Sequence, residues 1–336
     1  MPGRVGGSET YVRGLLSSEL GERLTVFPNE RPERSDVGKL LAITAGMTVG
    51  RRLRAPVDVL HYPLTVPVPR FAGPTVVTLH DLQHIELPSF FSRAERLYRR
   101  FTYDGAARRA SVVVTPSEHA RSMAVSRLGL DGSRVVVAPH GVDHERFTPD
   151  GPEAGPERFL YYPANLWPHK NHRRLLEGLA RAQDRSIELV LSGKPDGSEE
   201  LLALAGQLGV GDRVTHLGYV SHHKVPALLR GARAMIFPSL FEGFGQPPLE
   251  AMACGCAVAS SARGALAEVC SGAVLELDPL DVGSIAAAID VLACDDALVA
   301  DLGRRGPERA RAYTWARSAA LHMEAYEQAV SRPDAH

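Results

Sequence analysis

The chain has 336 residues, of which 44% are hydrophobic and 23% charged, and its formal net charge is -1. This length suits about two domains, and the composition is that of a globular protein. The balanced charge argues against general nucleic-acid binding. Because no apolar run reaches the ~18 residues of a membrane span and no signal peptide opens the chain, we expect a cytoplasmic protein.

The first half of the chain alternates short apolar runs with helical patterns. Ahead of them, GRVGGSE predicts a glycine loop with free amides before the helix SETYVRGLL. The runs VDVLHY, PTVVTLHD, ASVVVTPS and SRVVVAPHG predict buried parallel strands that end in polar residues, glycine or proline. The segments SRAERLYRRFTYDGAARRA and SEHARSMAVSRLG predict helices with serine N-caps.

A second alternation follows FTPDGPEAGPERF, a stretch of proline, glycine and acidic residues without periodicity. Its apolar runs are RFLYYPA, IELVLSGK, RVTHLGYV, RAMIFPS, CAVASS and AVLELDP. Strand and helix alternation on both sides of one linker predicts two doubly wound α/β domains that face each other across a cleft. We place the first domain at residues 1–150, the second at 151–315, and a last helix (316–336) against the first domain.

The segment FEGFGQPPLE, residues 241–250, combines features of an anion site. Gly243 and Gly245 let the backbone approach a ligand, and the following proline pair suits the first turn of a helix whose free N–H groups attract an anion. Glu250 is expected in that first turn, where it could accept hydrogen bonds from hydroxyl groups. A phosphate bound by backbone amides and a diol bound by a carboxylate are together the features of a bound nucleotide. For Glu250 alone, an acidic residue favoured by the helix dipole is the alternative.

The segment NLWPHKNHRRLLEGL places Lys170 in the loop after the strand RFLYYPA. A cation there could neutralise the charge on a leaving phosphate, although a solvated lysine is the usual role of such a residue. His169 and His172 flank it without an acidic partner at ligand spacing, so we expect no metal. The four cysteines lack a CxxC pair, and we expect buried, reduced thiols.

Two histidines end buried strands in the first domain. TVVTLHDLQH places His80 and Asp81 where a strand emerges, and His61 ends VDVLHY and is expected to face the same cleft. His80 could contact a substrate hydroxyl or orient a reacting group, or it could be a satisfied core histidine. The sequence contains no Asp-x-Asp, so a divalent metal chelating a diphosphate lacks its usual ligands.

Glu242 and Glu250, with seven residues between them, resemble the E-x7-E motif of retaining glycosyltransferases of family four, which have the GT-B fold. The resemblance covers most of the chain. VVVTPSEHARSMAVSRLGLDGSRVVVAPHGVDHERFTP is similar to the end of the family's first domain, and HLGYVSHHKVPALLRGARAMIFPSLFEGFGQPPLEAMACGCAVASS to its donor half. TLHDLQHIELPSFFS resembles mannosyl- and rhamnosyl-type members.

The resemblance implies roles for individual residues. Glu250 would bind the ribose hydroxyls, Lys170 the diphosphate, and Glu242 would lie near the donor sugar. The further donor-binding residues that it implies are Gly7, Asn165 (where the family usually has an arginine nearby), Gly218, Tyr219, Gly243, Phe244 and Gly245. His80, Asp81 and His61 would face the sugar or the acceptor. The candidate catalytic residues are therefore Lys170, Glu242, His80 and Asp81.

The implied reaction moves a hexose from a nucleotide-diphosphate sugar, with a weak preference for GDP-mannose, to a saccharide, lipid-linked or small-molecule acceptor. Configuration is retained, neither metal nor cofactor is needed, and the leaving phosphate takes the acceptor's proton. A nucleotide-sugar epimerase of the same fold is one alternative. An inactive binding protein is another, because family members have a strand before the glycine loop and only five residues precede Gly6.

The segment FFSRAERLYRRFTYDGAARRA leaves membrane association open. It could lie on an anionic bilayer beside a lipid acceptor. An ordinary amphipathic helix with a solvated basic face is the alternative that the sequence favours. The residues concerned are Phe90, Phe91, Leu97, Phe101, Arg93, Arg96, Arg99 and Arg100.

Overall fold

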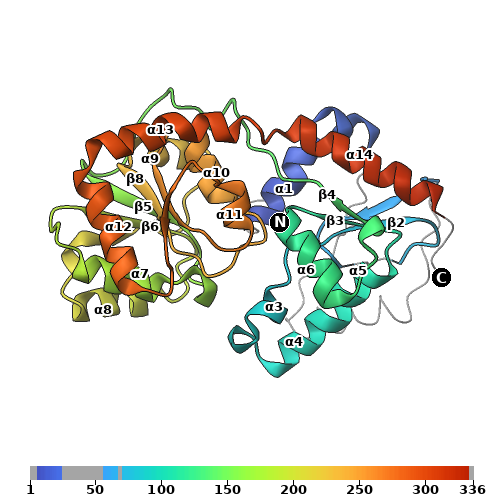
Figure 1. Cartoon of the computed structure of the whole chain (residues 1–336), viewed down its shortest axis with the longest axis horizontal. Coiled ribbons are helices and arrows are strands. Elements are labelled where there is room, and N and C mark those ends of the chain that lie inside the picture. Colours follow the sequence, from blue (N-terminus) through green and yellow to red (C-terminus); the bar gives the residue numbers. More distant parts are fainter. Residues whose placement is uncertain (1–5, 25–55, 67–69, 333–336) are drawn as a thin grey trace. The chain divides into compact units, whose positions relative to one another are not determined.

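The computed structural model describes residues 6–24, 56–66 and 70–332, which divide into two compact units (Figure 1). One unit runs to Gly141 and resumes at Trp315, and the other is Val142–Thr314. The expected boundary near residue 151 is therefore too late. The linker-like stretch belongs to the second unit because the Arg230 guanidinium donates to the carbonyls of Thr148, at 3.0 Å, and Pro152, at 2.9 Å.

The described part of the first unit contains a four-stranded parallel sheet in the order β1-β2-β3-β4. Its strands coincide with the four apolar runs expected there, and valine fills most of the buried positions because parallel strands are covered on both faces. The strands are β1 (Leu60–Tyr62), β2 (Thr75–Thr78), β3 (Val112–Thr115) and β4 (Val135–Val137).

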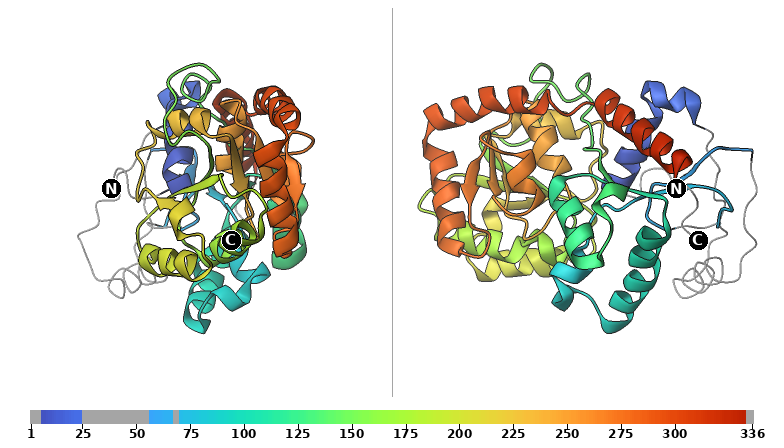
Figure 2. Two further views of the ribbon diagram at one scale, coloured as in Figure 1. Left: turned by 90° about the vertical axis from the view of Figure 1, so that its left-hand side faces the viewer. Right: turned by 45° about the vertical axis from the view of Figure 1, so that its right-hand side comes forward.

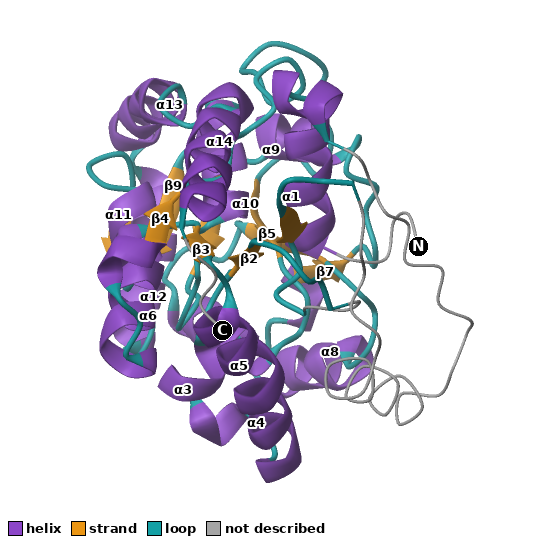
Figure 3. Cartoon of the chain, turned by 90° about the vertical axis from the view of Figure 1, so that its right-hand side faces the viewer, coloured by secondary structure: helices purple, strands orange, loops and turns teal. Residues whose placement is uncertain are grey.

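Helices cover both faces of this sheet, with α1 and α14 on one side and α5 and α6 on the other (Figures 1 and 3). The serine N-caps are confirmed, since Ser92 forms a capping box with Glu95 and Ser117 accepts from the Ala120 N–H. A π-helical stretch (Arg100–Asp104) continues α4 into α5. The α-helices are α1 (Gly6–Leu16), α3 (Gln83–Glu86), α4 (Arg93–Arg99), α5 (Gly105–Arg109), α6 (Glu118–Leu128) and α14 (Trp315–Ser331).

Helix α14 follows the second unit in sequence but packs within the first, against β2, β3 and β4. Close approach of α1 to α14 requires a glycine, because a Cβ at Gly14 would overlap the Trp315 ring. Among the described residues, no helix has the length and apolar character needed to cross a membrane.

The second unit contains a six-stranded parallel sheet in the order β10-β9-β8-β5-β6-β7. Strand order reverses direction between β5 and β8, which defines a topological switch point. The strands, again at the expected runs, are β5 (Phe159–Pro163), β6 (Glu188–Ser192), β7 (Val214–His216), β8 (Ala234–Phe237), β9 (Val258–Ser261) and β10 (Leu275–Leu277).

Helices lie on both sides of this sheet (Figures 1 and 2). Right-handed crossovers put α7 and α8 on one face and α9, α10 and α11 on the other. In agreement, α12 packs on α7 and α13 packs on α10. The bounds are α7 (His172–Arg181), α8 (Ser198–Gln207), α9 (Val225–Gly231), α10 (Gln246–Ala253), α11 (Ala265–Val269), α12 (Val282–Cys294) and α13 (Asp296–Ala310).

Candidate functional site

Two predicted site residues meet at the switch point of the second unit. Lys170 lies in the loop after β5 and Glu242 in the loop after β8, and the Lys170 ammonium donates to Glu242 Oε1 at 2.6 Å. Their side chains are only 11% and 13% exposed. The ammonium also lies 5.2 Å from the centre of the Phe237 ring. Lys170 is therefore a buried, paired cation, which rules out the solvated lysine considered from the sequence.

The loop that carries Lys170 is tied to its surroundings. Tyr162 donates its hydroxyl hydrogen to the Lys170 carbonyl at 2.6 Å. The next residue, Asn171, has a left-handed backbone with φ 63, and its side-chain amide donates to the carbonyls of Pro238, at 3.1 Å, and Pro279, at 2.7 Å. A non-glycine residue keeps this conformation only where its neighbours fix it. The backbone at Lys170 is thus held in place before any ligand binds.

Helix α10 points its N-terminus at the same loops. Gly245 precedes it with φ 120, and a Cβ there would lie 2.7 Å from Leu266 Cδ2, so this turn requires glycine. The free N–H groups of a helix's first turn, with the positive end of its dipole, attract anions. Pro247 and Pro248 have no N–H and supply none of these donors, so at this end the dipole, more than the amides, would attract an anion. Their missing N–H groups cost α10 no hydrogen bond, because first-turn N–H groups have no intrahelical acceptor.

Glu250 is the fifth residue of α10 and lies just beyond the first turn where it was expected, because α10 begins at Gln246, ahead of both prolines. The dipole explanation for Glu250 loses force at this position. The residue is only 6% exposed, and its Oε1 accepts from Gln246 Nε2 and from His222 Nε2, both at 3.3 Å. Burial, with a contribution from the Glu250 charge, raises the pKa of Tyr161 to about 12, so this neighbour stays protonated.

The loops after β5, β6 and β7 are joined along the same edge of the sheet. Asn165 Oδ1 accepts from the Lys194 N–H at 2.8 Å, and the Gly193 N–H donates to the Gly218 carbonyl at 3.0 Å. Tyr219 follows and is 60% exposed. Of these residues the sequence analysis named Asn165, Gly218 and Tyr219 as donor-binding, which stays a prediction. It did not name Gly193 and Lys194, although the "SGK" that ends the strand run IELVLSGK places them at the same strand end.

Two family models match the chain. The model described as Glycosyltransferase Family 4 matches residues 5–146, and the model described as Glycosyl transferases group 1 matches residues 143–309. The chain belongs to glycosyltransferase family 4. Its two parallel-sheet α/β units are those of the GT-B fold, as the sequence predicted.

Individual relatives agree with this assignment. The O-antigen chain mannosyltransferase B of Escherichia coli is 27% identical over 265 residues, which are 75% of this chain and 70% of that protein. Sucrose-phosphate synthase of Thermosynechococcus elongatus superposes with a TM-score of 0.73 at 22% identity, covering 96% of this chain and 94% of that one. HepE of Anabaena, solved in complex with UDP and glucose, superposes with a TM-score of 0.71 at 19% identity, and the match covers 96% of each chain.

Two expected donor-binding residues of this glycosyltransferase lie differently in the structure. Gly7 is inside α1, which begins at Gly6, so the expected glycine loop is the first turn of a helix and its residues before Gly6 lie outside the described part. Phe244 is 5% exposed and packs edge-on against Tyr313 at 5.8 Å. Its side chain therefore belongs to the core, so donor contact by Phe244 stays a prediction for its backbone alone.

In the first unit of the glycosyltransferase, His80 and Asp81 make local contacts. His80 Nε2 donates to the Pro63 carbonyl at 2.7 Å, and Asp81 Oδ1 accepts from the Gln83 N–H at 3.1 Å. Burial lowers the pKa of His80, so its ring is neutral near pH 7. Both residues are half-buried at the end of β2, and their expected contact with sugar or acceptor stays a prediction.

His61 uses both ring nitrogens inside the first unit. Its Nδ1 lies 2.8 Å from the Tyr326 hydroxyl and its Nε2 lies 2.7 Å from Thr78 Oγ1. Thr78 Oγ1 also lies 2.8 Å from the Tyr11 hydroxyl, which in turn lies 2.7 Å from His322 Nε2. The expected cleft-facing role is replaced by a structural one, because His61 connects β1 and β2 to α14.

The cysteine prediction is confirmed for three of four residues. Cys254, Cys256 and Cys270 are buried, and burial raises the pKa of each thiol to about 12. Cys294 is exposed, contrary to expectation.

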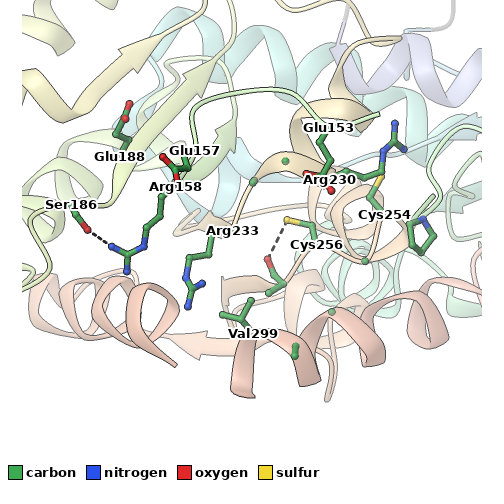
Figure 4. A pocket seen from close by; sticks show the side chains of 17 residues that line it. Glu153, Glu157, Arg158, Ser186, Glu188, Arg230, Arg233, Cys254, Cys256 and Val299 are labelled. Carbon is green, nitrogen blue, oxygen red and sulfur yellow. Dashed lines mark hydrogen bonds between the residues drawn. The ribbon is translucent and has the colours of Figure 1, made fainter. Parts of the chain in front are cut away.

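A cavity of about 960 Å³ opens at the opposite edge of the second unit's sheet (Figure 4). Its lining includes Arg158, Arg230 and Arg233, which lie at or near the amino ends of strands. Each guanidinium already donates to a backbone carbonyl of its own unit: Arg158 to Ala293, Arg230 to Thr148, and Arg233 to Leu292. Because ligands of open parallel sheets bind at the carboxyl edge, we place the site at Lys170 and not in this cavity.

Proposed function

We propose that this glycosyltransferase moves a hexose from a nucleotide-diphosphate sugar to an acceptor hydroxyl with retention of configuration. The observation that carries the proposal is the buried Lys170–Glu242 pair at the switch point, beside the N-terminus of α10. A cation and the positive end of a helix dipole together suit a diphosphate, and the buried Glu250 suits a ribose diol.

In this proposal the protein acts by alignment and by stabilising the leaving diphosphate. Lys170 exchanges its bond with Glu242 for one with the phosphate oxygens, and the positive end of the α10 dipole offsets part of the remaining charge. Glu242, released from Lys170, lies beside the donor sugar. The leaving phosphate accepts the proton of the attacking hydroxyl on the same face of the sugar, so no protein nucleophile and no metal take part.

Among donors we propose GDP-mannose first. Support comes from the name of the Escherichia coli relative, a mannosyltransferase, and from the resemblance of the HDLQH segment to mannosyl-type members. The Anabaena structure with UDP and glucose makes UDP-glucose the donor to compare. The three buried thiols fit a reducing compartment, and a cytoplasmic location is part of the same proposal.

A thermal-shift panel of UDP, GDP and dTDP, followed by transfer assays with the matching sugars, tests this function. We expect one nucleoside diphosphate to raise Tm, and its sugar to be transferred to an added saccharide acceptor in the presence of a chelator. An altered sugar formed without acceptor would instead indicate an epimerase. Nucleotide binding without transfer or hydrolysis would indicate a binding protein.

We further propose that the first unit contacts an anionic membrane through the arm formed by α4, the π-helical stretch and α5. Leu97 is 69% exposed, Phe101 44% and Phe90 37%, which is unusual for large apolar side chains on one short segment. Arginines surround them and match a negatively charged surface. The exposed arginines of this arm are Arg93, Arg100, Arg108 and Arg109.

Sedimentation with lipid vesicles checks this contact. We expect the chain to sediment with phosphatidylglycerol vesicles and to stay in solution with phosphatidylcholine vesicles or at high salt. The double variant Leu97→Asp, Phe101→Asp should abolish sedimentation, because it removes apolar area and adds negative charge. Leu202→Asp, at a 38% exposed leucine of α8, is the control and should leave sedimentation unchanged. Equal sedimentation of both variants would refute the contact.

A further inference from the structure

A chain of polar side chains leads from the start of the second unit to Glu250. Arg146 Nη1 donates to His222 Nδ1 at 2.9 Å, and His222 Nε2 lies 3.3 Å from Glu250 Oε1. Behind Arg146, its Nη2 lies 3.3 Å from Asp143 Oδ2. The His222 ring also packs edge-on against Phe147, with ring centres 5.3 Å apart. His222 is thus held by Arg146 and Phe147 in addition to its contact with the carboxylate.

The tautomer of the neutral His222 ring follows from its hydrogen-bond partners. A guanidinium has donors and no acceptors, so His222 Nδ1 must offer its lone pair to Arg146. In the neutral ring the hydrogen then sits on Nε2, which points at Glu250 Oε1 and donates to it. The opposite tautomer would place a hydrogen against the guanidinium and a lone pair against the carboxylate. Arg146 therefore selects the tautomer that binds Glu250.

The two donors to Glu250 act on the same carboxylate oxygen. His222 Nε2 comes from the loop before α9 and Gln246 Nε2 from the first turn of α10, and both bond Oε1. Two donors from different elements fix the plane of the carboxylate, so its rotation is restricted. The Oε2 atom then has a defined direction in which to accept hydrogen bonds from a ligand.

We infer that His222 is a positioning residue for the nucleotide: with Arg146 behind it, it orients the Glu250 carboxylate toward the two ribose hydroxyls. This inference rests on the proposed function, because it assigns the ribose to Glu250. It adds that recognition of the ribose depends on a side chain that need not touch the nucleotide. A purely structural His222 would affect stability and not the preference for ribose hydroxyls.

The test compares nucleoside diphosphate binding by calorimetry with binding of the dideoxy analogue, which lacks both ribose hydroxyls. The nucleotide is whichever of UDP or GDP binds the wild-type chain, because dTDP already lacks the 2′ hydroxyl. His222→Phe keeps a ring against Phe147 and removes both hydrogen bonds, whereas His222→Gln retains a donor and an acceptor. His223→Ala, at the exposed neighbouring histidine, is the matched control.

We expect His222→Phe to weaken nucleoside diphosphate binding by about tenfold, the size of one hydrogen bond to a charged group, and to leave binding of the dideoxy analogue and the ligand-free Tm unchanged. His222→Gln should recover part of the loss, and His223→Ala should match the wild type. Equal losses for both nucleotides, or no loss for either, would overturn the inference while leaving the proposed function in place. A wild-type chain that binds no nucleoside diphosphate would overturn the proposed function, and this inference with it.

Discussion

We expect Lys170→Ala to lower the rate of sugar transfer at saturating donor and acceptor by about a hundredfold to a thousandfold, the effect of losing one preorganised group that stabilises developing charge. The ammonium lies in a mostly buried setting beside the N-terminus of α10, where its interaction with a leaving diphosphate is weakly screened. Turnover by initial-rate kinetics is the measurement. Lys224→Ala, at an exposed lysine of the same unit, should keep the wild-type rate.

The same substitution also disturbs the fold, since it leaves the Glu242 carboxylate buried without its cation. Loss of one partner of a buried ion pair destabilises a protein by about 3–5 kcal/mol at most, and less where water reaches the pair. The double variant Lys170→Ala, Glu242→Gln removes the unpaired charge. In urea unfolding we expect it to recover stability without recovering turnover. A near-normal rate in either variant would show that Lys170 does not stabilise the leaving group.

Acid should destabilise the first unit through its buried histidines. His322 is fully buried, and burial lowers its pKa to about 4, while that of His61 is also lowered well below its usual value by burial. In the unfolded chain the His322 ring takes up a proton near pH 6.5, whereas in the folded chain it does so only near pH 4. Stability therefore falls as pH drops between these values, by up to about 3 kcal/mol for His322 alone.

The geometry explains why His322 resists protonation. Its Nδ1 donates to the Ser318 carbonyl at 2.7 Å, so in the neutral ring Nε2 accepts the Tyr11 hydroxyl hydrogen. A proton on Nε2 would leave two donors facing each other. His322→Gln keeps an acceptor for Tyr11 without a titrating group, and it should flatten the pH dependence.

Urea unfolding at pH 7 and pH 4.5 measures this effect. The chain has two tryptophans, and Trp315 stacks near His140 in the first unit, so its fluorescence in a Trp167→Phe background reports on that unit. We expect the loss of stability at pH 4.5 to shrink in His322→Gln. An unchanged loss would mean that other groups of the first unit carry the acid sensitivity, such as His61, whose pKa burial also lowers.

The architecture could be predicted from the sequence because buried parallel strands leave a local signature. Every expected strand appears, and Lys170 and Glu242 meet although 72 positions separate them, since both follow strands that are neighbours in the sheet. The predicted boundary near residue 151 was wrong because a stretch rich in proline and glycine has the composition of a linker even where its backbone is hydrogen-bonded to one of the units. Composition does not reveal Arg230, which lies far along the chain.

The side-chain roles were harder to predict, for a related reason. His61 follows a strand just as His80 does, and nothing near it in sequence indicates that Tyr326 will take its Nδ1. Phe244 stands between two glycines of the predicted anion loop, yet its ring fills the core against Tyr313. Nothing near His222 in the sequence indicates the positioning role that we propose, because that role depends on Arg146 and Glu250, which are close to it only after folding.

The placement of α14 has a consequence for the order in which a nascent chain can fold. The second unit is continuous in sequence, so it can form as soon as its residues have left the ribosome. The first unit is synthesised first but can be completed only after the second. Its Tyr11 and His61 form hydrogen bonds with His322 and Tyr326, which lie near the end of the chain. During synthesis the valine-rich sheet of the first unit therefore lacks α14, one of the two helices on one of its faces, and we expect the chain to be most exposed to aggregation and to capture by chaperones in this interval.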